Sequence, residues 1–217
     1  MSYHGDVVVG GTPDVRELAQ LMITKVAVGP MDNNAYLLRC RRDDEQVLID
    51  AANDADTLAE VVGADGLARI VTTHRHGDHW QALAEIVAAT GADTVAGDED
   101  AEEIPVRTDE RVSDGDRVRV GRCELEVISL VGHTPGSIAL LYDDPDGTPH
   151  LFTGDSLFPG GPGRTTRRED FDSLMADLQH KVFDRLPDET WVYPGHGADT
   201  TLGAERPHLS EWRERGW

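Results

Sequence analysis

The chain has 217 residues, and 41 acidic residues against 20 Lys and Arg give it a formal net charge of −21. This charge disfavours nucleic acid and anionic membrane surfaces as partners, because both bind clustered Lys and Arg. The length suits one well-cored domain, which we predict over residues 1–217 with its core at about 20–200.

The predicted elements alternate along the chain, with short runs rich in Val, Ile and Leu between helical stretches. Strands are predicted over residues 22–28, 35–40, 46–49, 70–73, 94–96, 117–120, 124–130, 138–142, 151–153 and 190–193. Helices are predicted over residues 55–62, 80–89 and 171–186. The Asp-Pro and Asp-Gly steps of residues 143–149 predict a hairpin turn. The pattern indicates a fold that mixes helices and strands.

Neither the termini nor the cysteines point to export or to a membrane. Residues 1–11 carry no basic region followed by an apolar run, and no stretch of about 18 apolar residues occurs. We therefore predict a soluble, cytoplasmic protein that acts on a small molecule, with homo-oligomer formation left open. Cys40 and Cys123 lie outside any CxxC spacing, so we expect two buried thiols.

The most informative segment is His74-Arg75-His76-Gly77-Asp78-His79, which follows a predicted strand and precedes a predicted helix. In an extended segment, residues i and i+2 project to the same side, so His74 and His76 can hold one ion. Asp78 and His79, at the helix start, can then face a second ion. With nine His in 217 residues, this pattern arises by chance about three times in a thousand such sequences, so it is specific.

Three further residues of the same chemical type each follow a predicted apolar strand and are framed by Gly or Pro. They are His133, Asp155 and His196. Imidazole and carboxylate together suit Zn, Fe, Mn or Co. With the histidine segment, these residues fill two coordination spheres. The other histidines, His4, His150, His180 and His208, have no such neighbourhood and are predicted to lie outside the site.

The motifs at 73–79, 132–137, 153–156 and 194–197 resemble the metal motifs of the metallo-β-lactamase superfamily, in its glyoxalase II-like branch. The resemblance implies an α+β fold, a four-layer αβ/βα sandwich. It also implies one metal ion on His74, His76 and His133, a second on Asp78, His79 and His196, and Asp155 bridging both. Only 21 residues follow His196 (217 − 196), whereas full-length glyoxalase II continues into a helical domain that contacts glutathione.

The predicted activity is hydrolysis of a thioester, or a related ester, of a small thiol. Two divalent cations, Zn or alternatively Fe or Mn, can share a water and lower its pKa to about 7, which supplies a bridging hydroxide as nucleophile. Asp78 and Asp155 are the catalytic carboxylates of this scheme. A thiolate leaves readily because the thiol pKa is about 8.5.

Arg164 is the predicted substrate-binding residue. It lies in a Gly-rich stretch at 159–165, just after Asp155, where it can offer a fixed cation to a substrate carboxylate. The resemblance supports this role, because a basic residue at the matching position in glyoxalase II relatives contacts the thiol portion of the substrate.

Three alternatives stay open from the sequence. The nearest is a lactonase on the same machinery. Sulfur dioxygenases share the metal motifs, but they use a single iron, which here would bind His74, His133 and Asp155. A non-catalytic protein that uses metal for stability is the third, and it would not need seven ligands with a bridging Asp.

Overall fold

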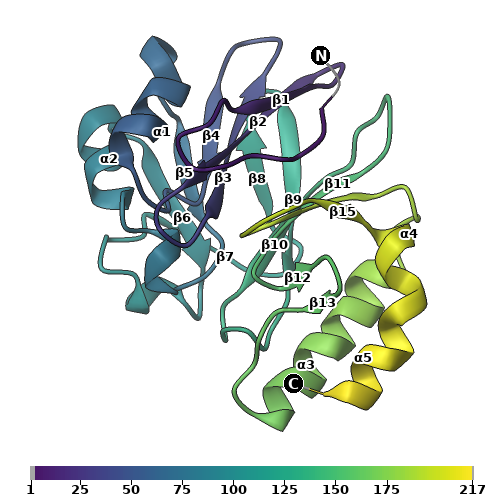
Figure 1. Ribbon diagram of the computed structural model, residues 1–217. Helices are drawn as coiled ribbons and strands as arrows, with labels where there is room; N and C mark the ends of the chain where they lie inside the picture. Colours follow the sequence, from purple (N-terminus) through teal and green to yellow (C-terminus); the bar gives the residue numbers. More distant parts are fainter. Residues whose placement is uncertain (1–2, 217) are drawn as a thin grey trace.

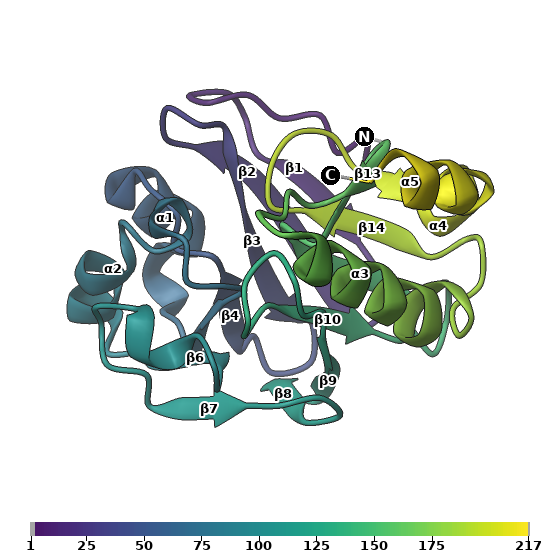
Figure 2. The same ribbon diagram turned by 90° about the horizontal axis from the view of Figure 1, so that it is seen from below.

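A computed structural model describes residues 3–216, so the outermost residues of the predicted 1–217 domain, Met1, Ser2 and Trp217, lie outside the described residues. Two β-sheets stack face to face, and helices cover the outer face of each sheet (Figures 1 and 2). The predicted α+β fold, a four-layer αβ/βα sandwich, is confirmed.

The first sheet has the strand order β1-β2-β3-β4-β5-β6-β7. Its strands are β1 (Asp14–Glu17), β2 (Leu21–Val28), β3 (Asn33–Cys40), β4 (Gln46–Ile49), β5 (Arg69–Thr72), β6 (Asp93–Gly97) and β7 (Glu110–Val112). Pairing is antiparallel from β1 to β4 and parallel from β4 to β7. The carboxyl ends of β4, β5 and β6 therefore meet at one edge.

The second sheet has the order β15-β14-β11-β10-β9-β8. Its strands are β8 (Arg117–Val120), β9 (Cys123–Ser129), β10 (Ile138–Tyr142), β11 (His150–Gly154), β14 (Trp191–Pro194) and β15 (Thr200–Thr201), and β12 (Leu157–Phe158) pairs with β13 (Gly161–Pro162) as a small separate ribbon. Both β9 and β11 run antiparallel to β10, and β14 runs parallel to β11. Hence β9, β11 and β14 share a direction and end at the same edge.

Within residues 3–216, five α-helices lie on the outer faces of the two sheets. The helices α1 (Ala55–Val62) and α2 (Leu83–Thr90) cover the first sheet, and α3 (Arg168–Asp177), α4 (Leu202–Glu205) and α5 (Leu209–Arg215) lie on the side of the second (Figure 2). Short 3₁₀ turns occur at Gly63–Asp65, Gly77–His79, Ala101–Glu103 and Arg206–His208, and α3 continues as a π-helical turn over Leu178–Phe183. None of the helices within residues 3–216 is long and apolar enough to cross a membrane.

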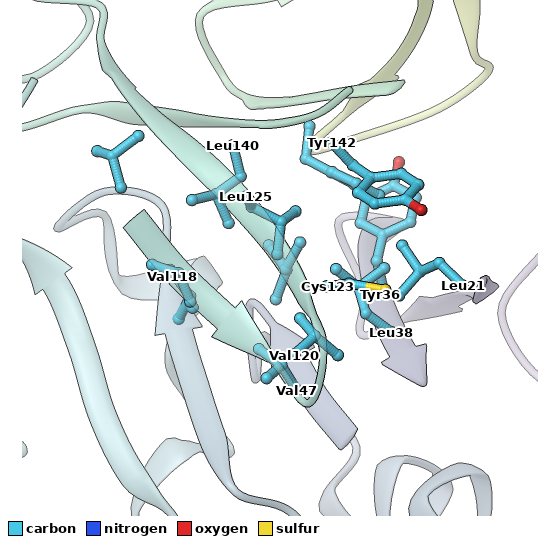
Figure 3. Packing of buried hydrophobic residues seen from close by; sticks show 14 of the residues in the cluster. Leu21, Tyr36, Leu38, Val47, Val118, Val120, Cys123, Leu125, Leu140 and Tyr142 are labelled. Carbon is cyan, nitrogen blue, oxygen red and sulfur yellow. The ribbon is translucent and has the colours of Figure 1, made fainter. Parts of the chain in front are cut away.

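Three apolar clusters separate the four layers. The central one joins side chains of both sheets, such as Leu38 of β3 and Leu125 of β9, which are both labelled in Figure 3. A second cluster packs α1 and α2 on the first sheet, and a third packs α3 and Trp212 of α5 on the second. Burial of apolar surface in these clusters is the main force that holds the layers together.

The local pattern of the sequence explains the elements. In β8, Val118 and Val120 point into the core while Arg117 and Arg119 point to solvent, as expected for a strand with one buried face. In contrast, every residue of β10 is buried, because this strand lies inside the second sheet and is covered on both sides. In α1, Leu58 and Val62 are one helical turn apart and make the buried stripe.

All ten predicted strands are present, and the hairpin predicted at 143–149 joins β10 to β11. The helix predicted from residue 80 begins at Leu83, because Gly77–His79 form a 3₁₀ turn and Trp80 leaves helical geometry, with φ −140°. The helix predicted over 171–186 begins at Arg168 and changes to π geometry at Leu178. The pattern of the sequence did not predict the short strands β1, β7, β12, β13 and β15 or the helices α4 and α5.

The two cysteines are buried and unpaired, as predicted. Cys123 packs in the central cluster beside Tyr36 and Leu38 (Figure 3). Burial raises the pKa of the Cys123 thiol to about 11. The thiol therefore stays protonated and behaves as a small apolar side chain.

His150 of β11 predicts a pH dependence of stability that does not involve the histidine segment. The side chain is 2% exposed, and its Nδ1 lies 2.9 Å from the Tyr193 hydroxyl, which accepts a hydrogen bond from Arg16. Burial, together with the Arg16 charge, lowers the His150 pKa to about 4. The unfolded chain, with a pKa near 6.5, therefore binds this proton before the folded chain does.

The contribution of neutral His150 to stability is therefore fully present above its pKa in the unfolded chain. It decreases as the pH falls toward its pKa in the folded chain. We expect the free energy of unfolding of the wild type to fall by about 2 kcal/mol more than that of His150→Gln when the pH drops from about 7 to about 5. Urea unfolding of both proteins at the two pH values measures the difference. Parallel pH profiles would contradict the assignment.

Candidate metal centre

Four residues of the candidate centre come from the segment that follows β5. His74 lies in a bend rather than in the predicted extended segment, His76 has extended backbone with φ −65° and ψ 138°, and Gly77–His79 form a 3₁₀ turn that presents Asp78 and His79. The indole of Trp80 donates a hydrogen bond to the Arg75 carbonyl at 2.9 Å, which links the two ends of this turn. The segment lies where the first sheet ends, as expected for a site in a fold of this kind.

The other three residues follow strands of the second sheet. His133 comes after β9, Asp155 after β11 and His196 after β14. Since these strands share a direction, their carboxyl ends deliver the three side chains to one edge. The structure brings all seven predicted residues together at the junction of the two sheets.

One group of donors consists of His74, His76 and His133. Their ring nitrogens lie within 4.8 Å of one another, and His76 Nδ1 is 2.9 Å from His133 Nε2. Two neutral imidazoles at this distance can share one proton or face one cation. The spacing fits a small ion between them.

A second group consists of Asp78, His79 and His196. Asp78 Oδ2 lies 3.4 Å from His79 Nε2 and 3.3 Å from His196 Nε2. Because zinc bonds to nitrogen and oxygen are about 2.0–2.2 Å long, donors about 3.3 Å apart can all reach one ion. The three donor atoms thus converge on one point, and this arrangement is called the tripod below.

Asp155 lies between the two groups. Its Oδ1 is 3.4 Å from His79 Nε2, and its Oδ2 is 3.5 Å from His196 Nε2 and 3.6 Å from His133 Nε2. The more distant His74 Nε2 is 4.0 Å away. One carboxylate therefore contacts imidazoles from both groups.

Two atoms of the cluster test whether cations fit there. His74 Nε2 and Asp155 Oδ1 are buried and have no hydrogen-bond partner among the described residues. Buried polar atoms normally have a hydrogen-bond partner, and a bound ion can take the place of that partner. Gly195 keeps the space beside them open, because a Cβ there would lie 2.2 Å from Asp155 Oδ1. The donor set and the space fit divalent metal ions.

Protonation states also suit metal binding. Burial, with the neighbouring His79, holds the pKa of His74 well below its usual value, and burial with His133 lowers the pKa of His76. Burial alone would raise the pKa of Asp155, but the imidazoles of His196 and His79 hold it well below the usual range. Neutral imidazoles and an ionised carboxylate are the ligand forms.

His79 differs because a second carboxylate holds it. Its burial would lower the pKa, but Asp50 and Asp155 together outweigh burial and raise the pKa to about 10. Asp50 Oδ2 lies 2.8 Å from His79 Nδ1, and Asp50 also accepts hydrogen bonds from the backbone and hydroxyl of Thr73. Asp50 therefore orients the ring, and a divalent cation at Nε2 would displace the proton.

Asp50 was missed in the sequence, although a signal for it exists. It follows the apolar strand β4 directly, as Asp155 follows β11. It was not framed by Gly or Pro, which is the feature that singled out the other positions.

Backbone carbonyls hold two other rings. His133 Nδ1 donates to the Arg164 carbonyl at 2.7 Å, and His196 Nδ1 donates to the Met31 carbonyl at 3.0 Å. Such bonds leave Nε2 aimed into the cluster as the ring nitrogen that can bind a cation. The Arg164 side chain itself is exposed. The predicted substrate residue thus lies next to the cluster, with its carbonyl on His133.

A second buried carboxylate, Asp100, joins the loops that carry His76 and His133. It accepts hydrogen bonds from the Arg75 and Gly136 backbone nitrogens and from the Thr134 hydroxyl. Gly136 is required here, since a Cβ would lie 2.3 Å from the Asp100 nitrogen. Asp100 was also missed, because nothing near it in the sequence resembles a ligand motif.

The fold and the histidine-rich centre together define a known class of protein. A family model described as the metallo-beta-lactamase superfamily matches residues 28–196. The chain therefore belongs to this superfamily, as the motifs predicted, and its family members hold divalent metal ions on His and Asp residues of this kind.

Within the superfamily, the chain is similar to several individual proteins. Hydroxyacylglutathione hydrolase from Polaromonas sp. is 36% identical over 166 residues, which cover 76% of this chain and 62% of that protein. The solved structure of ETHE1 from Myxococcus xanthus is 30% identical with a TM-score of 0.76, covering 86% of this chain and 82% of that one. The structure of TTHA1623 in a di-iron-bound form is 32% identical with a TM-score of 0.69, covering 84% and 96%. The predicted similarity to the glyoxalase II-like branch is confirmed.

Proposed function

We propose that the chain is a metal-dependent hydrolase that cleaves a thioester, or a related ester, of a small thiol. The observation that carries the proposal is the position of Asp155, whose two oxygens face imidazoles of two separate donor groups. The similarity to hydroxyacylglutathione hydrolase supports the thioester as the bond that is cleaved. The chain covers less than two thirds of that relative's length, so the thiol it accepts is a separate question.

The proposed ligands divide between two divalent ions. His74, His76 and His133 hold the first ion, Asp78, His79 and His196 hold the second, and Asp155 bridges both. Bound there, the cations supply a hydroxide nucleophile near neutral pH and neutralise charge that develops on the attacked carbonyl oxygen. We assign zinc to the site, with iron and manganese as alternatives that the same donors accept.

Two carboxylates have catalytic roles in this proposal. Asp155 fixes the separation of the two donor groups, and its side chain is 13% exposed. Asp78 is 18% exposed, and its pKa is lowered: burial opposes this, but the Asn33 amide and the His79 ring outweigh it. Its carboxylate therefore stays ionised, which is the form that holds a cation at the open side of the site. A thiolate then leaves with little further assistance.

Arg164 is the proposed contact for an anionic group of the substrate. Its carbonyl is bound to His133 Nδ1, so the residue cannot move far from the donor group. Its exposed guanidinium carries a fixed charge that can pair with a carboxylate in two hydrogen bonds. In a chain of net charge −21, a cation beside the site would oppose the general repulsion of an anionic substrate.

A single-iron dioxygenase is the second candidate. His74, His133 and Asp155, its three expected ligands, do face one another, with Asp155 Oδ2 at 4.0 and 3.6 Å from the two rings. The complete second group of Asp78, His79 and His196 favours the hydrolase, because a single-ion enzyme has no use for it. A lactonase would use the same two groups on a cyclic ester.

Metal content by mass spectrometry on protein purified without chelators tests the proposal. It is measured beside hydrolysis of small thioesters and lactones and beside oxygen uptake with a persulfide. About two ions per chain with thioester turnover supports the hydrolase. One iron with oxygen uptake would replace it with the dioxygenase, and turnover of lactones alone would make the chain a lactonase. His180→Ala, at an exposed histidine outside the centre, is the matched control and should leave the metal content unchanged.

A further inference from the structure

Asn33, the first residue of β3, lies against the second donor group. The side chain is 1% exposed, and its Nδ2 donates to Asp78 Oδ2 at 2.9 Å. The same nitrogen is 3.5 Å from His79 Nε2 and 3.4 Å from His196 Nε2. One amide nitrogen therefore contacts one atom of each of the three residues in this group.

The backbone holds Asn33 in this place. Asn33 forms an isolated antiparallel bridge with His196, and the Asn34 nitrogen donates to the Gly195 carbonyl at 2.7 Å. The Asn34 side chain adds a hydrogen bond to the Pro194 carbonyl at 2.9 Å. The start of β3 and the segment after β14 thus form one unit, in which the Asn33 amide cannot turn away from the donor group.

The contacts of Asn33 are selective. Among the hydrogen-bond contacts of the described residues, those of the Asn33 side chain go to Asp78, His79 and His196, and none goes to His74, His76 or His133. An amide N–H that donates to a carboxylate oxygen occupies one of its lone pairs and restrains the rotation of the carboxylate, so the other lone pairs keep one orientation. Such outer contacts set how strongly a metal site binds its ion.

We propose that Asn33 is a positioning residue for the second metal ion alone, and that it sets the affinity of this ion without affecting the first. The inference rests on the proposed two-ion site. Its amide holds Asp78 Oδ2 within 3.4 Å of both ring nitrogens, so the tripod is formed before an ion arrives. Losing one such contact lowers metal affinity by about 10–100-fold.

The test is a zinc titration of metal-free protein against a competing chelator, which yields two dissociation constants. In Asn33→Ala, we expect one constant to rise by about 10–100-fold and the other to stay within about twofold of the wild type. Asn33→Leu keeps the approximate size of the side chain but has no N–H to donate to Asp78, so the same constant should rise by about 10–100-fold in this variant as well. If Asn33 only filled space at the start of β3, both constants of Asn33→Leu would stay near their wild-type values.

Asn53→Ala is the matched control, because this asparagine contacts Gln81 on the surface and not the donor groups. Its two constants should equal those of the wild type. Wild-type protein that binds fewer than two ions would reject the two-ion site itself. Two ions in the wild type, with Asn33→Ala either unchanged or weakened equally at both sites, would reject only the role of Asn33.

Discussion

Replacing Asp155 by alanine is expected to lower the metal content from about two ions per chain to one or fewer and to reduce thioester turnover by about 1000-fold or more. The reason is its position, since its two oxygens lie 3.4–3.6 Å from His79, His196 and His133 and belong to both donor groups. Without it, the imidazoles of the two groups face each other with no negative charge between them. Metal analysis and steady-state kinetics on the same preparation measure both effects.

Asp172→Ala is the appropriate control for that experiment. Asp172 is an exposed carboxylate on α3 that pairs with Arg168, far in sequence from any of the proposed ligands. Its removal should change neither metal content nor turnover, since exposed ion pairs contribute little. Normal metal stoichiometry with full activity in Asp155→Ala would refute the ligand assignment.

Replacing Lys25 by methionine is expected to destabilise the fold by about 3–5 kcal/mol. Lys25 is fully buried, and its ammonium donates to the carbonyls of Gly5 and Gly197 and to Asp199 at 2.6 Å. All three ammonium protons are used. Methionine fills similar space but leaves Asp199 as a buried charge without its cation.

The surroundings of Asp199 explain why Lys25→Met should destabilise the fold so strongly. The Asp199 side chain is 1% exposed and also accepts hydrogen bonds from the Tyr3 hydroxyl and the Trp191 indole. These neutral donors cannot replace a full positive charge. Urea unfolding of metal-free protein measures the change, and Lys181→Met, at the chain's only other lysine, is the control. A loss below about 1 kcal/mol in Lys25→Met would contradict the predicted role.

The sequence predicted the elements whose residues alternate or repeat clearly, and it failed where an element is short. β10 is a run of five apolar residues and was found with its bounds. The strands β12, β13 and β15 have two residues each and exist only because a partner lies beside them. Local pattern does not contain that information, since tertiary context decides such elements.

The same division holds for the candidate site. The seven proposed ligands are marked by residue type and by their place after strands, so their meeting could be predicted. The residues that hold these ligands are not marked. Asp50, Asp100 and Asn33 are common polar residues whose importance arises from burial and from contacts across 25 to 45 positions of sequence. Only the folded chain reveals which of its many acidic residues are buried.

The division of the donors between the two sheets links metal binding to folding. Asp78 and His79 follow a strand of the first sheet, while Asp155 and His196 follow strands of the second. An ion held by both sets acts as a cross-link between the halves of the sandwich, and it binds the folded chain in preference to the unfolded one. At a free ion concentration of about 100 times its dissociation constant, each ion would add about 2.7 kcal/mol to stability. The resistance of the protein to heat should therefore follow the supply of metal in its surroundings.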